Sequence, residues 1–139
     1  FSQAYLIFVA NGFAVDVASP RGGAVEADEF NKNKPYNKAL LTDEKALSLL
    51  KTTKPTASLN ATNYDAVYVV GGKGAMFDLP FDPALQELLA SVYNSKDGIV
   101  SAVCHGPAAL VNVKSSDGKY ILAGKTVSGF CNAEEEKFG

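Results

Sequence analysis

The segment GIVSAVCHGPAALV, residues 98–111, constrains the fold more than any other part of the chain. Residues 99–103 form a short apolar run rich in β-branched side chains, which predicts a buried strand. Pro107 and the helix-forming residues after it predict the start of a helix. Cys104 and His105 occupy the turn between the two. A sharp turn from strand to helix lifts its apical side chain above a sheet, so the pattern is typical of a nucleophile elbow with a thiol as nucleophile.

Cys104 has two interpretations. Free cysteines are often buried and simply pack in a core. A reactive thiol is favoured by the neighbouring sequence, because His105 is the only histidine of the chain, a Gly-Pro pair follows it, and a second glycine-rich strand end lies upstream at residues 71–74. The positive end of the predicted helix also favours the thiolate form. We therefore interpret Cys104 as a reactive nucleophile.

The composition is that of an ordinary globular chain. The 139 residues are 47% hydrophobic and 20% charged, with a formal net charge of −2, which suits one domain with a real core. Without an excess of basic residues we expect no nucleic-acid partner. No apolar run approaches the roughly 18 residues of a membrane span. Two cysteines in different contexts form no disulfide framework, which favours a reducing compartment, and we expect the cytoplasm.

Apolar periodicity along the chain predicts alternating helices and strands. We expect helices over residues 1–10, from Thr42 to Leu50, over 83–93 and after Asn132, strands over 13–18 and 64–70, strand-like pieces over 120–122 and 125–128, and a polar loop over 24–36. This order predicts a doubly wound α/β sandwich with a parallel sheet.

The glycine-rich residues 71–74 follow the strand predicted over 64–70. Glycines let main-chain N–H groups approach a ligand closely and form an anion-binding concavity, although the spacing matches neither the dinucleotide fingerprint nor the P-loop. A plain tight turn is the alternative. Beside Cys104 in a parallel sheet, this strand end becomes a wall of the same crevice.

Three further polar features have simple structural interpretations. Asp16 could be a ligand-binding carboxylate, but an outward-facing residue is the simpler interpretation. Cys131 could be a second redox thiol, but we interpret it as a small packed side chain. One histidine and scattered acids make no metal cluster, so we expect no metal.

Three segments together resemble the ThiJ/PfpI superfamily: AVCHGP at residues 102–107, GGKGAMFD at 71–78, and GFCNAEE at 129–135. The resemblance covers nearly the whole chain. It implies the flavodoxin-like fold of the class I glutamine amidotransferases, a doubly wound α/β sandwich with a mostly parallel central sheet. Within the superfamily the chain is similar to the glutathione-independent glyoxalases (glyoxalase III), a branch that includes heat-shock chaperones.

The resemblance also implies that residues 1–139 are a single domain, which we expect to be incomplete at both ends. A glutamate that the family carries on its first helix would precede Phe1, and family members continue with more sheet and helix beyond the last glutamates. The resemblance implies no cofactor, and because relatives usually form dimers we expect a homodimer.

Matching positions imply roles for individual residues. Cys104 is the nucleophile, His105 its partner and Glu135 the third member of a triad, with Glu134 and Glu136 one position away. Main-chain N–H groups of Gly72 and His105 hold a developing oxyanion. Lys73, where many relatives carry histidine, lies in the wall of the substrate pocket.

The implied reaction converts methylglyoxal-type 2-oxoaldehydes and water to 2-hydroxy acids such as D-lactate. The thiolate of Cys104 attacks the aldehyde, and a base, either His105 or the family's first-helix glutamate, moves a proton between the carbons through an enediol. Two alternatives remain open. One is a cysteine amidase or peptidase built on the same elbow, and the other is a holdase chaperone or redox-stress protein without turnover.

Overall fold

The structure is a computed structural model that describes residues 1–27 and 30–138 of the chain. The chain forms two compact units, Phe1–Ser58 and Leu59–Gly139, and each is described by itself. The interpretation of the chain as a single domain stays a prediction. Every helix in the described ranges is too short or too polar to span a bilayer.

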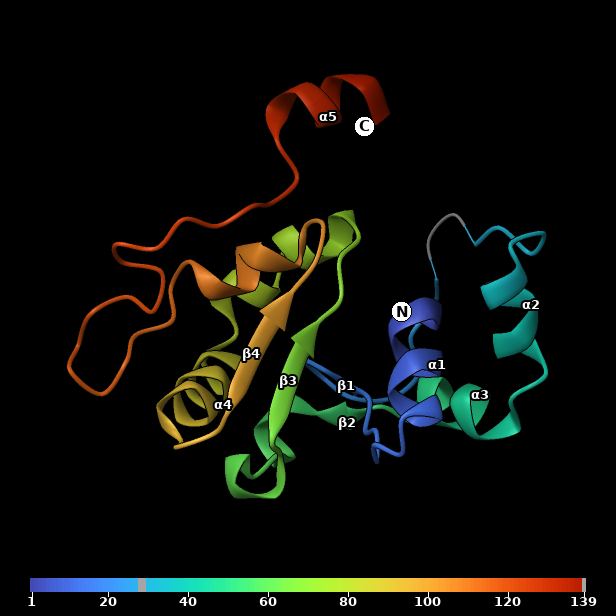
Figure 1. The fold of residues 1–139 in the computed structure, drawn as a ribbon, viewed down its shortest axis with the longest axis horizontal. Helices are drawn as coiled ribbons and strands as arrows, with labels where there is room; N and C mark the ends of the chain where they lie inside the picture. The colour runs from blue at the N-terminus through green and yellow to red at the C-terminus, as the bar shows by residue number, and fades with distance from the viewer. Residues whose placement is uncertain (28–29, 139) are drawn as a thin grey trace. The chain divides into compact units, whose positions relative to one another are not determined.

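The first unit combines helices with one short pair of parallel strands (Figure 1). Its elements are α1 (Ser2–Ala10), β1 (Ala18–Ser19), α2 (Pro35–Leu41), α3 (Glu44–Lys51) and β2 (Lys54–Pro55). Tyr5, Leu40 and Ala46 form its buried core. The helix predicted over residues 1–10 is confirmed, and it ends before Gly12, whose φ of +84° suits glycine.

The strand predicted over residues 13–18 is wrong in extent. Only Ala18 and Ser19 pair with β2, because in this parallel register residues 13–15 would lie opposite residues 49–51, which belong to α3. Asp16, in the segment before β1, is exposed and lies 2.5 Å from Lys54 Nζ, which confirms an outward-facing residue.

Two helix starts in this unit also differ from the prediction. The helix expected from Thr42 starts at Glu44, because the Asp43 carboxylate accepts a hydrogen bond from the Ala46 N–H (2.9 Å) and acts as its cap. The loop predicted over residues 24–36 ends early, since Pro35 opens α2 at a position where its missing N–H costs no hydrogen bond.

The second unit contains the parallel pair β3 (Ala66–Val69) and β4 (Ile99–Ala102), joined by α4 (Pro83–Asn94). All three were predicted within a few residues. The Asp82 carboxylate caps α4 by accepting hydrogen bonds from the N–H groups of Ala84 and Leu85. The buried face of α4 packs with both strands into one core, formed by Val69, Leu85, Leu88, Leu89, Val92, Ala109, Leu110, Val113 and Ile121.

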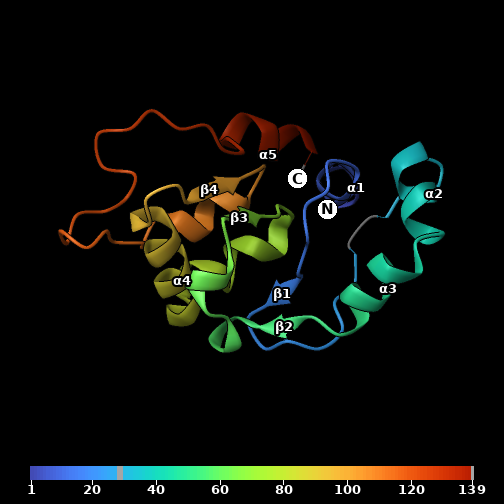
Figure 2. The same cartoon turned by 60° about the horizontal axis from the view of Figure 1, so that its bottom comes forward.

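The strand-like pieces predicted over residues 120–122 and 125–128 are not strands. Tyr120 makes an isolated antiparallel bridge with Lys114. Two consecutive turns follow, closed by hydrogen bonds from the Ala123 N–H to the Tyr120 carbonyl and from the Lys125 N–H to the Leu122 carbonyl. Ile121 is buried in the core, so its apolar character reflects packing of one side chain and not a ladder. The last element described is α5 (Asn132–Phe138), which lies near the carboxyl end of β4 (Figure 1, Figure 2).

Candidate active site

The turn after β4 has the geometry of a strand-to-helix elbow. Val103 continues the ladder by donating its N–H to the Val69 carbonyl, and Gly106 then donates to the Val103 carbonyl (2.8 Å). Cys104, between them, has a φ of +58°, and no other non-glycine residue in the described ranges has a positive φ. Such a conformation is costly for an L-residue and persists only where the surroundings impose it. The elbow is therefore a strained turn with the thiol at its apex.

The helix expected after the elbow is shorter than predicted. Residues Gly106–Leu110 form a 3-10 helix, labelled η5, which is held by bonds such as Ala108 N–H to the His105 carbonyl (3.1 Å). A single tight turn is enough to bury Ala109 and Leu110 in the core. The turn therefore carries a smaller helix dipole than the predicted α-helix would.

Two glycines let the elbow approach the neighbouring strand end. A Cβ on Gly71 would lie 2.6 Å from the Cβ of Cys104, and one on Gly106 would lie 2.6 Å from the carbonyl oxygen of Val69. Real Cβ atoms do not come this close to other atoms. The packing of Gly71 against Cys104 was not predicted, although the paired glycines at the strand end were its visible signal.

The structure brings Cys104, His105 and Glu135 together. Cys104 Sγ lies 3.3 Å from His105 Nδ1, and His105 Nε2 lies 2.6 Å from Glu135 Oε1. The His105 side chain is only 6% exposed, the Glu135 side chain is 34% exposed, and Cys104 is exposed. With Nε2–H donated to the carboxylate, Nδ1 is left to accept the thiol proton. The arrangement can therefore activate a nucleophile that solvent can reach.

Phe130 joins the segment before α5 to the elbow. Its N–H donates to the Cys104 carbonyl (3.0 Å), and its ring centroid lies 4.3 Å from that of His105. The aromatic ring therefore covers the imidazole while Glu135 contacts its edge. This role was not predicted, although Phe130 belongs to the GFCN motif.

The neighbours of Glu135 have other environments. The Glu134 carboxylate accepts a hydrogen bond from the Cys131 N–H (2.9 Å), and Glu136 is exposed. The pKa of Glu134 is lowered, first by this main-chain hydrogen bond, then by one from the Cys131 thiol, and also by the charge of His105. The interpretation of Cys131 as a packed side chain is wrong, because it is exposed at the start of α5.

Gly72 and Lys73 follow Gly71, the glycine that packs against Cys104 of the elbow. Gly72 has a φ of +105° and precedes the 3-10 helix Lys73–Met76, and both Gly72 and Lys73 are exposed. Their place beside the elbow follows from Gly71, one residue earlier. Contact of either residue with a substrate stays a prediction.

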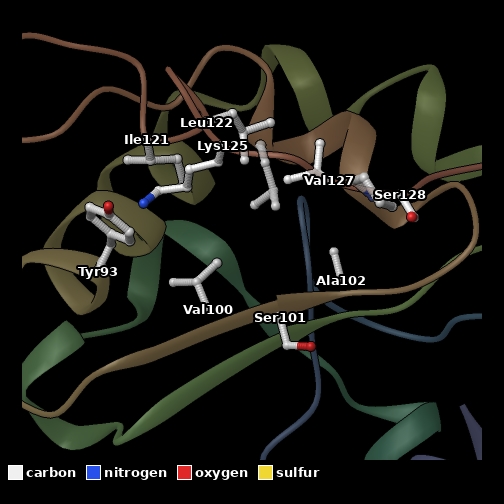
Figure 3. Close-up of a pocket in the computed structure, with 11 residues that line it drawn as sticks. Tyr93, Val100, Ser101, Ala102, Ile121, Leu122, Lys125, Val127 and Ser128 are labelled. Carbon is white, nitrogen blue, oxygen red and sulfur yellow. The ribbon is translucent and has the colours of Figure 1, made fainter.

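A groove of about 320 Å³ lies between β4, the turn after the elbow and residues 121–128 (Figure 3). Its walls are mainly apolar, with Lys125 near the ring of Tyr93, and neither Cys104 nor His105 lines it. The lining residues are Tyr93, Val100, Ser101, Ala102, Pro107, Leu110, Ile121, Leu122, Lys125, Val127 and Ser128. Across the described part of the chain, no three His, Cys, Asp or Glu residues are placed to hold a metal ion.

Nearly the whole chain is similar to curated proteins of known name. The chain is 34% identical to the glutathione-independent glyoxalase hsp3102 of Schizosaccharomyces pombe over 97% of its length, and 30% identical to the glutathione-independent glyoxalase HSP31 of Saccharomyces cerevisiae over 95%. It covers only 59% and 58% of these relatives, so it spans less than two thirds of their length.

Solved structures give the same fold. The Rapid Encystment Protein of 24 kDa from Francisella tularensis matches with a TM-score of 0.91 at 31% identity, over 99% of this chain and 62% of that protein. Glyoxalase III of Candida albicans matches with a TM-score of 0.86 at 29% identity, over 97% and 59%. These neighbours confirm the flavodoxin-like α/β class predicted from the sequence. The DJ-1/PfpI family model matches residues 1–138, and the chain is therefore a member of the DJ-1/PfpI family.

Proposed function

We propose that the protein is a glutathione-independent glyoxalase that converts methylglyoxal-type 2-oxoaldehydes and water to 2-hydroxy acids such as D-lactate. The observation that carries the proposal is His105, buried between an exposed thiol at 3.3 Å and a carboxylate at 2.6 Å. The names of the relatives, glutathione-independent glyoxalase among them, support the same substrate class. We assign catalytic roles to Cys104, His105 and Glu135.

The proposed reaction begins with transfer of the Cys104 proton to Nδ1 of His105. The thiolate then attacks the aldehyde carbon, and protonated His105 gives its proton to the new alkoxide, which yields a hemithioacetal and a neutral imidazole. His105 moves the proton from this carbon to the adjacent one through an enediol, which leaves a thioester of the 2-hydroxy acid. Water hydrolyses the thioester and regenerates the thiol. The net change adds one water to the oxoaldehyde, so the hydrogen shift stays within the substrate and requires no cofactor.

The glycine-rich residues 71–74, beside the elbow, have a supporting role in the proposed reaction. We assign the main-chain N–H groups of Gly72 and His105 to the oxygen that becomes negative when the thiolate attacks. The tight packing of Gly71 on Cys104 supports this assignment, because it holds the start of the glycine loop beside the Cys104 Cβ and the His105 N–H. Lys73, exposed in that loop, is assigned to the wall of the substrate pocket.

Location and assembly belong to the same proposal. Cys104 and Cys131 are both free thiols, which fits a reducing compartment such as the cytoplasm. A homodimer is the assembly that we propose from the family resemblance.

The test is lactate formation from methylglyoxal without glutathione, measured for the protein at its full natural length and for its Cys104→Ala variant. We expect turnover by the parent and none by the variant. A folded parent that forms no lactate would overturn the proposal. The oriented triad also suits a cysteine amidase, so hydrolysis of an amide through an acyl-enzyme, in place of lactate formation, would favour that function.

A further inference from the structure

The first turn of α5 is closed by a side chain that the proposed reaction does not use. Glu134 Oε2 accepts a hydrogen bond from the Cys131 N–H (2.9 Å), while the N–H groups of Glu134 and Glu135 both donate to the Cys131 carbonyl (3.0 Å each). This is the main-chain half of a capping box, in which the third helical residue reaches back to the N–H of the cap.

The capping side chain matters more in this helix than in most. α5 has seven residues, and so short a helix is unstable unless contacts at its ends hold it. Cysteine is not among the side chains that cap well, since serine, threonine, aspartate and asparagine are the preferred caps. The carboxylate of Glu134 therefore supplies the hydrogen-bonding atom that best defines where α5 begins.

The same turn sets the direction of Glu135. Successive helical residues point about 100° apart, so when Glu134 reaches back along the helix axis its neighbour projects to the side. There Glu135 Oε1 meets His105 Nε2 at 2.6 Å. On the other side of Cys131, Phe130 anchors the chain to the Cys104 carbonyl and packs on the His105 ring. Movement of the cap would move the carboxylate that orients His105.

We propose that Glu134 is a positioning residue, which fixes the first turn of α5 and thereby holds Glu135 on His105. Glu134 itself touches neither Cys104 nor the reacting atoms in this proposal. The titratable groups next to Glu134 are the Cys131 thiol, which donates a hydrogen bond to its carboxylate, and His105 of the elbow, and the lowered pKa of Glu134 keeps its carboxylate ionised. Measurement of lactate formation tests this proposal only if the proposed glyoxalase function holds, whereas measurement of Cys104 reactivity does not depend on that function.

The experiment compares Glu134→Ala, Glu134→Gln and the exposed control Glu136→Ala in the protein of full natural length. The first readout is the pH profile of Cys104 alkylation by iodoacetamide, with mass spectrometry separating Cys104 from Cys131. The second readout is lactate formation from methylglyoxal. We expect Glu134→Ala to shift the alkylation profile and to slow lactate formation roughly tenfold, since small misplacements of catalytic groups have effects of this size or larger.

Glutamine can accept the same hydrogen bond, so Glu134→Gln should stay within about threefold of the parent. Glu136→Ala should match the parent. A serine cap should offset the loss of the carboxylate, so Cys131→Ser combined with Glu134→Ala should recover most of the lost rate. This rescue also keeps the proposal testable if Glu134→Ala alone folds poorly.

A double-mutant cycle with Glu135→Ala gives the decisive comparison. If Glu134 acts through Glu135, adding Glu134→Ala to Glu135→Ala should change the rate no further. An alkylation profile of Glu134→Ala identical to that of Glu136→Ala, or rate losses that multiply in the double variant, would overturn the proposal. A changed alkylation profile in a protein that forms no lactate would support the positioning role and reject the glyoxalase function.

Discussion

The two halves of the triad are held in different ways. Cys104 and His105 follow a four-residue strand in register with β3 and stand on a core with four side chains that are at most 1% exposed, Leu89, Val92, Ala109 and Val113. Glu135 lies on a seven-residue helix at the end of a segment without regular pairing, and it reaches the elbow through single hydrogen bonds and one ring contact. The nucleophile and base are thus positioned by packing, and the acid by a few polar contacts.

This contrast explains where strain can be stored. A positive φ at Cys104 requires neighbours that do not yield, and Gly71 and Gly106 provide them by allowing strand and turn to touch. The segment that carries Glu135 has no such constraint, so its geometry depends on hydrogen bonds that individual substitutions can remove.

Among substitutions that test this contrast, the largest effect is expected at His105, which contacts both Cys104 and Glu135. His105→Gln keeps a polar side chain but cannot take the thiol proton, so we expect lactate formation to fall by about 10²–10⁴-fold. Glu135→Gln should cost less, since the imidazole remains, the amide oxygen can still accept its N–H, and only the negative charge beside it is lost. Steady-state kinetics of the two variants checks this order, and equal losses would contradict a separate role for the acid.

The core beneath the elbow comes next. Leu89 is fully buried, so Leu89→Ala should lower the free energy of unfolding by about 2–5 kcal/mol. Val127, 55% exposed in the segment before α5, is the matched position, and Val127→Ala should change stability by less than about 0.5 kcal/mol. Urea unfolding of both variants measures the difference, and similar losses would show that the two regions are packed alike.

A smaller effect is expected from a single methyl group at the elbow. In Gly106→Ala the new Cβ meets the Val69 carbonyl, which cannot move aside without disturbing β3, so we expect a loss of about 1–3 kcal/mol. Gly74→Ala is the control, since nothing lies within 4 Å of a Cβ there. Thermal unfolding compares the two variants. A neutral Gly106→Ala would mean that the elbow yields more easily than its geometry indicates.

The smallest effect is expected from the titration of the Glu134 carboxylate, in the segment that carries the triad acid Glu135. The Cys131 main-chain hydrogen bond is the main cause that lowers the pKa of Glu134 below its ordinary 4.5, so the ionised carboxylate stabilises the start of α5 above that pH. This contribution is lost as pH falls through the lowered pKa. The Cys131 amide proton should therefore titrate by NMR with a midpoint below 4.5. Glu134→Gln should abolish the titration, and a midpoint at or above 4.5 would contradict the hydrogen bond.

Much of the second unit could be predicted from the chain alone. The strands before and after α4 show local apolar patterns that match their burial, and Cys104 stands between a strand pattern and a Gly-Pro helix start. These features depend on residues close in sequence, so they can be seen before the fold is known.

Other features depend on partners far along the chain. The length of β1 was decided by α3, whose last residues stand where a partner for residues 13–15 would have to lie. The burial of Ile121 was decided by a core to which it contributes one side chain. The 3-10 form of residues 106–110 likewise depends on how Ala109 and Leu110 enter that core. Periodicity within a short segment contains none of this information.

The three glutamates of α5 show most clearly what the sequence determines and what only the tertiary structure decides. The family resemblance was enough to predict Glu135 as the acid, with Glu134 and Glu136 one position away. Which of Glu134, Glu135 and Glu136 meets His105 was decided by the tertiary structure, because the three have the same chemistry and differ only in the direction that each takes around the helix. The sequence alone determined which reactive groups the protein carries. Only the packing of distant segments could determine which groups come within hydrogen-bonding distance, since that distance depends on the path of the whole chain between them.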